Sequence, residues 1–416
     1  MGFLVVLVYV TLYLLSPGDM FPALAPYRVL LVLALLTLPL SVIPFLQSQV
    51  ILTLRTQILL VVAFFFVALV SWIPHGWFGG SMVVLDSLVP NLIAYFVGIV
   101  HFRSLGRLKI LRLALVLVGL YILWTALGQV PQARSTGVET PYVMAGIDQP
   151  RIRGLGMLHD PNYFGQYLLI LLPMLFVTTK PKGLGTGYFA AIPVTLAFLY
   201  GIYMTGSRGT ALGCILLIAL FLARKFKKVG LFLSGILGVG VLAAVNLSRT
   251  RTISISGGID RLMLWSDGLA FFKSSPLWGI GYYGFVGKEG MTAHNSYLLC
   301  AAELGLIGYF FWMSVLVITM IQLRRIANLP TADPSWKRWA AALTMSLTVY
   351  MFTSFFLSRV YDLPLYLLLG MTGATIASVG GEQKLALRQS NWPAWSAGLC
   401  VFSIMLIYVL VRLRAV

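Results

Sequence analysis

Apolar runs of a length suited to crossing a bilayer recur along almost the whole chain. A helix needs about 20 mostly apolar residues to cross the hydrocarbon core. Charged residues make up only 10% of the 416 residues, whereas they make up about 25% of a soluble globular protein. We therefore predict an all-α polytopic membrane protein with about 12 (12–13) transmembrane helices in a single transmembrane domain, residues 1–416. The thirteen candidate runs lie near residues 2–15, 27–45, 57–74, 84–100, 108–127, 162–178, 186–204, 208–223, 229–246, 294–322, 339–357, 362–379 and 394–412.

Lys and Arg residues cluster in alternate loops between these runs. Short cytoplasmic loops are enriched in both residue types, so we predict that loops 103–112, 180–182, 224–228, 324–338 and 384–388 are cytoplasmic. The net charge of +18 mostly reflects this orientation signal and does not indicate a nucleic acid partner. Arg412 and Arg414 would face outward with thirteen spans, so we expect one run near an end of the chain to be re-entrant or interfacial. The alternate, outward loops are then 16–26, 75–83, 128–161, 205–208, 247–293 and 358–361.

The outward loops are rich in arginine. Arg carries a planar fork of donors that suits phosphate oxygens, so this bias predicts a phosphorylated partner outside the membrane. No DxD, HExxH or clustered His/Cys pattern occurs in these loops, and we predict neither a metal site nor a cofactor. The cationic residues concerned are Arg134, Arg151, Arg153, Arg208, Arg249, Arg251, Arg261, Lys273, Lys288 and Arg359.

The two long outward loops differ in their predicted structure. Loop 128–161 carries four prolines among Gly, Ser and Thr residues, which makes long regular helices improbable there. In loop 247–293, apolar residues of segment 259–273 recur at helical spacing, which predicts an amphipathic helix at the membrane interface. Asp260 is expected near its N-terminus, where a carboxylate meets free N–H groups. Segment 275–281 should then break the helix and turn the chain back toward the membrane.

Three polar side chains at the outward boundary are candidates for chemistry. Arg208 lies in the tight turn Gly206–Gly209, where a helix start would add its positive end, so the turn reads either as an anion site or as a snorkelling arginine. Arg261 is a second cation, or simply a solvated charge on the interfacial helix. His294 lies where loop 247–293 re-enters the membrane. It is either a hydrogen-bonding residue at the interface or a general base, a role that its unperturbed pKa of about 6.5 suits. Glu303 is expected to be structural and to pair with another helix.

These residues carry a resemblance to a known family. The chain resembles bacterial O-antigen ligases over about residues 200–310, a quarter of its length. Compatible sequences also occur at 160–163 and around Arg359. The ordered motifs are Gly206-Ser207-Arg208-Gly209, Arg261 with Trp265, Pro276-Leu277-Trp278-Gly279-Ile280-Gly281, His294-Asn295-Ser296-Tyr297-Leu298 and Glu303-Leu304-Gly305-Leu306-Ile307-Gly308.

The resemblance implies a polytopic membrane glycosyltransferase of the C-type class in a bacterial inner membrane, with its active site facing the periplasm. Such an enzyme transfers a glycan, without metal, from undecaprenyl diphosphate to the lipid A core oligosaccharide and so completes lipopolysaccharide. By position, Arg208 and Arg261 would bind the diphosphate, and His294 would act on the acceptor hydroxyl as base or orienter. Arg134, Arg151 and Arg153 are expected either to bind phosphates on the acceptor or to be simply solvated loop arginines. The further candidates for substrate binding are Ser207, Trp265, Asn295 and Arg359.

Several other functions stay open at this stage. O-antigen polymerases and protein O-oligosaccharyltransferases of the same superfamily use the same class of donor. The protein-glycosylating branch is disfavoured because no large C-terminal soluble domain is present. A transporter of lipid-linked glycans is a different class. Transporters often show repeated halves and helices broken at the midplane, whereas this sequence shows no repeated halves and its polar cluster is expected at one face.

Overall fold

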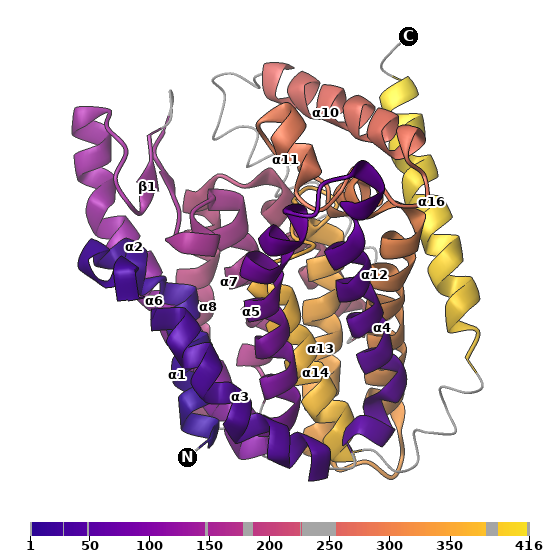
Figure 1. Ribbon diagram of the computed structural model, residues 1–416. Helices are drawn as coiled ribbons and strands as arrows, with labels where there is room; N and C mark the ends of the chain where they lie inside the picture. Colours follow the sequence, from indigo (N-terminus) through magenta and orange to yellow (C-terminus); the bar gives the residue numbers. More distant parts are fainter. Residues whose placement is uncertain are drawn as a thin grey trace. The chain divides into compact units, whose positions relative to one another are not determined.

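The computed structural model is almost entirely helical (Figure 1). It describes residues 2–27, 29–47, 50–145, 149–177, 186–224, 226, 255–379 and 390–413. The predicted run 229–246, Arg249 and Arg251 lie outside these residues. Contacts divide the chain into two compact units, each built from three separate segments. Unit 1 comprises Met1–Leu40, His101–Ile253 and Ala327–Thr353, and unit 2 comprises Ser41–Val100, Ser254–Ile326 and Ser354–Val416.

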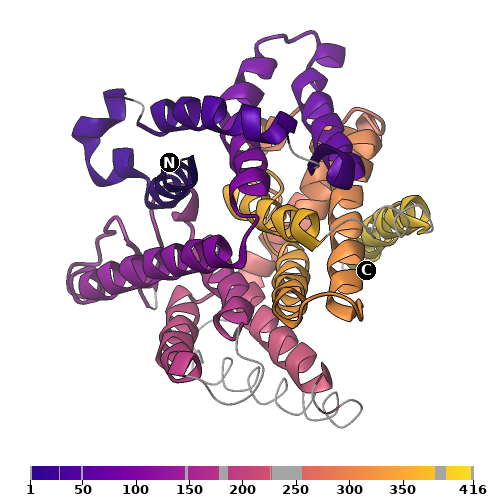
Figure 2. The same ribbon diagram turned by 90° about the horizontal axis from the view of Figure 1, so that it is seen from below.

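Unit 1 is a set of apolar helices with one small β-hairpin. α6 packs against α7 and α8, and α7 also packs against α13. In Figure 2, α6 runs across the view. The elements are α1 (Gly2–Leu15), α2 (Pro17–Met20), η1 (Pro22–Tyr27), α6 (Leu105–Thr136), β1 (Val143–Met144), β2 (Arg151–Ile152), η3 (Gly156–Leu158), α7 (Pro161–Leu175), α8 (Thr186–Thr205), a helix over 208–224, and α13 (Pro334–Thr353).

Polar side chains join the helices of unit 1 to one another. Gln166 of α7 donates through Nε2 to Thr353 Oγ1 of α13 at 2.6 Å. Tyr167 of α7 donates to the Leu115 carbonyl of α6 at 2.7 Å. Apolar surface gains little when helices associate within lipid, so such bonds and close packing fix which helices are neighbours.

Unit 2 is a second set of helices, with one helix set at an angle to the others. Figure 1 shows α10 inclined to α4, α12 and α16, and α10 packs against α16. α3 (Val29–Gln47) belongs to both units, and α5 and α12 end in unit 1. The elements are α4 (Val50–Val70), η2 (Ile73–His75), α5 (Gly80–His101), α10 (Ile255–Ser274), α11 (Gly284–Glu289), α12 (Ser296–Asn328), α14 (Leu363–Val379) and α16 (Trp392–Arg412).

Among the described residues, six helices are long and apolar enough to cross a membrane. This finding makes the protein a multi-pass membrane protein, while the larger count of about 12 spans stays a prediction. Shorter apolar helices occupy Gly2–Leu15, Phe189–Thr205 and Leu363–Val379. The six candidates are Pro22–Leu46, Leu54–His75, Gly80–His101, Leu105–Thr136, Ser296–Asn328 and Trp392–Arg412.

The loops of unit 1 meet in the alternating pattern that the positive charges predict. The predicted outward loops 128–161 and 205–208 are joined by Arg151, whose Nε donates to the Thr205 carbonyl at 2.7 Å. The predicted cytoplasmic ends are joined by Arg112, whose Nη1 donates to the Met174 carbonyl at 3.0 Å. Loops that the sequence assigns to the same side therefore lie together in this unit.

The same pattern holds within unit 2. Trp72, two residues after the end of α4, donates through Nε1 to the Tyr282 carbonyl at 2.9 Å. His75 lies 2.7 Å from the Gly279 carbonyl through Nε2. Loops 75–83 and 247–293 were both predicted to face outward, and these bonds place them side by side.

Two local expectations for the long loops are wrong. α6 continues through Pro131 to Thr136, so regular helix extends well into loop 128–161. A hairpin of β1 and β2 then pairs Val143 with Ile152, which makes the fold nearly, but not fully, all-α. α10 begins at Ile255, so Asp260 lies within the helix and not at its N-terminus.

The long helix α12 is broken near its first third. Gly305 has φ 62° and ψ −169°, which interrupts the helical hydrogen bonds. Segment 276–281 supplies the missing partners: Ile280 N donates to the Ala302 carbonyl at 2.9 Å, and Leu306 N donates to the Pro276 carbonyl at 2.7 Å. A break of this kind is tolerated in a membrane protein only when its backbone groups are satisfied by other protein segments.

Candidate active site

α10 presents two of the predicted site residues on one face. Arg261 and Trp265 are four residues apart, so they lie one helical turn from each other. Trp265 is 7% exposed and donates through Nε1 to the Ala293 carbonyl at 3.0 Å. Its ring meets Phe355 edge-on, with 5.5 Å between the centroids. The predicted interfacial helix is therefore attached to the residue just before His294.

His294 lies in a tight turn that leads into α12. Its φ is 49°, in the left-handed region that few residues with a Cβ adopt. Asn295 follows, fully buried, and its Oδ1 accepts from the backbone N–H groups of Tyr297 at 3.0 Å and Leu298 at 3.1 Å. That side chain thus caps the first turn of α12. Its Nδ2 has no hydrogen-bond partner among the described residues.

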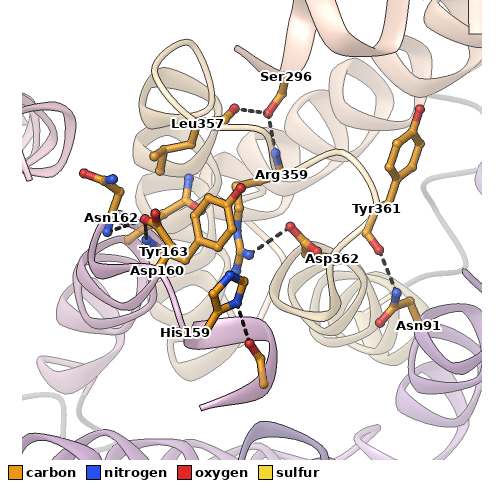
Figure 3. Close-up of polar contacts among 12 residues, drawn as sticks. Asn91, His159, Asp160, Asn162, Tyr163, Ser296, Leu357, Arg359, Tyr361 and Asp362 are labelled. Carbon is orange, nitrogen blue, oxygen red and sulfur yellow. Dashed lines mark hydrogen bonds and ion pairs between the residues drawn. The ribbon is translucent and has the colours of Figure 1, made fainter. Parts of the chain in front are cut away.

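The loop between α13 and α14 is attached to the start of α12. Ser296 donates through Oγ to the Leu357 carbonyl at 2.5 Å, and Arg359 N donates to Ser296 Oγ at 2.8 Å (Figure 3). The Arg359 side chain is 1% exposed and forms an ion pair from Nη1 to Asp362 Oδ2 at 2.8 Å. A buried guanidinium needs such a partner. Arg359 therefore has a structural role in this loop, while its predicted contact with substrate stays a prediction.

Glu303 is held by a tyrosine and a backbone amide. It is 1% exposed, accepts from the Tyr361 hydroxyl at 2.8 Å through Oε2, and accepts from Phe285 N at 3.2 Å through Oε1. Burial raises the pKa of Tyr361 well above its usual value, and the nearby Glu303 raises it further, so the tyrosine stays a donor. Glu303 is thus structural, as expected, and its partners come from a loop and the short helix α11.

Tyr361 and Asn91 are residues that the sequence reasoning missed. Asn91 of α5 donates through Nδ2 to the Tyr361 carbonyl at 2.6 Å (Figure 3). The Tyr361 ring lies against Tyr282, with 4.4 Å between the centroids. An Asn inside an apolar helix is a usable signal, because a polar group in a membrane span needs a partner. The sequence alone gave no way to identify that partner.

In unit 1, the Gly206–Gly209 turn begins a helix, as expected. Ser207 caps that helix by accepting from Thr210 N at 3.3 Å through Oγ. Arg208 occupies the first helical position and is exposed. Arg151 holds the turn through Thr205 and also donates through Nη2 to Asn162 Oδ1 at 3.3 Å. Arg151 therefore holds the turn in place, and the Arg208 side chain is exposed at the protein surface.

The remaining arginines of loop 128–161 differ in what they contact. Arg153 pairs with Glu139 at 3.1 Å between Nη2 and Oε2, and its Nη2 also donates to the Thr140 carbonyl at 3.2 Å. Arg134 lies exposed in the last turn of α6. Protein acceptors therefore occupy part of the donor fork of Arg153. The same holds for Arg151, which donates to the Thr205 carbonyl and to Asn162 Oδ1. Phosphate binding by the three arginines stays a prediction.

The predicted site residues thus fall into two groups, one in each unit. Hydrogen bonds within the same unit hold several members of each group. No group of three or more His, Cys, Asp or Glu side chains that could hold a metal ion occurs in the part of the chain that the structure describes. The unit 2 group is Arg261, Trp265, His294, Asn295 and Arg359, and the unit 1 group is Arg134, Arg151, Arg153, Ser207 and Arg208.

Comparison with known families gives one match. Residues 193–313 match the model of a family described as O-Antigen ligase, and this region contains Arg208, Arg261 and His294. A comparison with curated proteins found no match. The matched region covers the motifs that carry the resemblance in the sequence. The match confirms that resemblance over residues 193–313 of this multi-pass membrane protein.

Proposed function

We propose that the protein is an O-antigen ligase. It transfers a glycan from undecaprenyl diphosphate to the lipid A core oligosaccharide at the periplasmic face of a bacterial inner membrane. The observation that carries the proposal is the family match over residues 193–313, which includes all three residues assigned to the chemistry. The reaction needs a lipid-linked donor and a membrane setting, and both fit a multi-pass protein of this family.

The proposed reaction is an in-line attack of an acceptor hydroxyl on the anomeric carbon of the donor sugar. The glycosidic bond forms as the bond to the diphosphate oxygen breaks, and undecaprenyl diphosphate leaves with the electron pair. A single displacement of this kind inverts the anomeric centre. His294 takes the hydroxyl proton as general base, a role typically worth about 10²- to 10⁴-fold in rate.

Arg208 and Arg261 would bind the diphosphate and stabilise the charge that develops on it as it leaves. Fixed donors directed at developing charge are worth about 3 to 4 kcal/mol each when one is removed. The exposure of Arg208 and its support by Arg151 favour this role, because the guanidinium is available while its turn is held. The transfer is then expected to proceed without a metal ion.

Asn295 is a further candidate for substrate contact in unit 2. Its oxygen is used by the α12 cap, but its buried Nδ2 has no partner among the described residues. A buried donor without a partner costs about 1 to 3 kcal/mol. That cost favours a polar group of the substrate next to Asn295.

A purified assay tests the function. Full-length protein in nanodiscs is mixed with glycan-diphosphate-undecaprenol donor, with and without lipid A core acceptor, and the products are identified by mass spectrometry. A ligase forms lipid A core glycan only when the acceptor is present. Lengthening of the donor without the acceptor would instead identify a polymerase. Movement of intact donor across the bilayer with no covalent product would identify a transporter.

A further inference from the structure

We propose that Trp265 is a positioning residue that holds the turn bearing His294. The inference deepens the proposed function and rests on it, because it concerns how the general base is aimed. It assigns to the indole N–H a protein partner, the Ala293 carbonyl, in place of the substrate contact that the sequence suggested. Trp265 acts through His294 and does not itself touch the reacting atoms.

The first support is the bond itself. Trp265 Nε1 and the Ala293 oxygen are 3.0 Å apart, a good N–H···O distance, and they join residues 28 positions apart in the chain. The indole is 7% exposed, so water competes little for the donor. Phe355 packs edge-on against the ring and limits its rotation. The bond is therefore held in place by the packing around it.

The second support is the backbone of the turn. His294 has φ 49°, and a residue with a Cβ in this region costs about 1 to 2 kcal/mol relative to ordinary backbone. Such strain persists only where the surroundings hold it. Trp265 holds the residue before His294, while the Asn295 cap and the Ser296 N–H, which donates to the Ser354 carbonyl at 2.8 Å, hold the residues after it.

The third support is the position of Arg261, one turn before Trp265 on α10. A single helix thus carries the proposed diphosphate ligand and the group that fixes the base. Losing the indole bond would free the turn while leaving Arg261 on its helix. Small displacements of a catalytic group, on the order of 1 Å, reduce rates by about 10²-fold.

Removing only the N–H tests the inference. We would replace Trp265 with β-(3-benzothienyl)alanine, which keeps the ring shape and has sulfur in place of the N–H, and would also make Trp265→Phe. Both variants should lower kcat by about 10- to 100-fold and leave the donor KM within about twofold. Met263→Ala, at an exposed position of the same helix, is the matched control and should keep normal kcat. A benzothienyl variant with unchanged kcat would overturn the inference.

A double-variant cycle separates positioning from general structural damage. If Trp265 acts through His294, then Trp265→Phe should have no further effect on kcat in a His294→Ala background. A merely structural role would lower kcat by the same factor in both backgrounds. An equal loss in the two backgrounds therefore contradicts the proposal.

Hydrogen exchange gives a readout that does not depend on activity. The benzothienyl variant should speed exchange of the backbone amides of residues 293–298, while those in the middle of α10 and in α14 stay protected. Unchanged exchange at 293–298 would overturn the inference even if the ligase assignment is correct. Absence of transfer by the wild-type protein would overturn the ligase assignment, and the exchange result would still decide the role of Trp265.

Discussion

The two groups of site residues are built in different ways. In unit 2, the group is interlocked: α12 is broken at Gly305, segment 276–281 fills the break, and Arg359 is buried against Asp362. In unit 1, Arg208 is exposed in a turn that Arg151 holds through a hydrogen bond to the Thr205 carbonyl.

The arginines of the predicted outward loops can be divided by what their side chains contact. Arg359 and Arg153 form ion pairs with protein carboxylates, and Arg151 bonds a carbonyl and an amide oxygen. Arg208 and Arg134 are exposed. Substitutions in unit 2 should therefore mainly reduce stability, whereas Arg208 substitutions should mainly reduce activity. His294, Arg261 and Trp265 are exceptions in unit 2, because their proposed roles concern the reaction itself.

The largest effect is expected for Gly305→Ala. A Cβ at this position would lie 2.2 Å from the Leu277 oxygen, and the residue has φ 62°. We expect an apparent loss of about 2 to 5 kcal/mol in the free energy of unfolding, from the strained backbone and the clash together. Thermal unfolding in detergent would measure it. Gly287→Ala is the control, since nothing lies within 4 Å of its added Cβ. Equal stability of the two variants would contradict the close packing of segment 276–281 against the break in α12.

His294→Ala should reduce transfer by about 10²-fold or more with little loss of stability. The rate of lipid A core glycan formation at normal protein levels is the measurement. His75→Gln provides the control, because His75 is an exposed histidine of the same unit and glutamine keeps an N–H for the Gly279 carbonyl. Near-wild-type transfer by His294→Ala would rule out the base assignment.

Arg359→Met should destabilise the protein by about 2 kcal/mol. Removing one partner of a buried ion pair usually costs about 3 to 5 kcal/mol, and we reduce this value because Asp362 is 28% exposed and stays partly solvated. The matched change in unit 1, Arg153→Ala, should cost less than about 1 kcal/mol, because its partner Glu139 is 51% exposed. Thermal unfolding of both variants tests the ranking, and a reversed order would remove the contrast between the units.

Arg208→Lys should have the smallest effect on stability and an effect of about tenfold on transfer. Lysine keeps the positive charge but loses the planar fork that contacts two phosphate oxygens at once. Steady-state kinetics with varied donor would measure the change. Arg134→Lys, at the other exposed arginine of this unit, is the comparison. Full activity of Arg208→Lys would show that bidentate contact is unimportant.

Much of the architecture could be predicted because the membrane limits the choice of structure. Apolar runs must form helices in lipid, and α7, α8 and α13 lie where such runs were expected. The contacts between loops within each unit agree with the sides that the alternation of Lys and Arg predicts, and the sides themselves stay a prediction. The prediction that loop 128–161 lacks long regular helix was wrong at its start, because Pro131 is accommodated inside α6.

The helical class and the motifs that resemble those of O-antigen ligases can be read from the amino-acid sequence alone. These properties depend on local composition, spacing and order along the chain. What the motif residues contact is seen only in the folded protein. Segment 276–281 forms hydrogen bonds with α12 on both sides of Gly305. Glu303 accepts from Tyr361, and Trp265 donates to the Ala293 carbonyl. Such bonds join residues far apart in the chain. Their partners therefore depend on how the helices pack, and in a membrane that packing leaves no hydrophobic pattern to read.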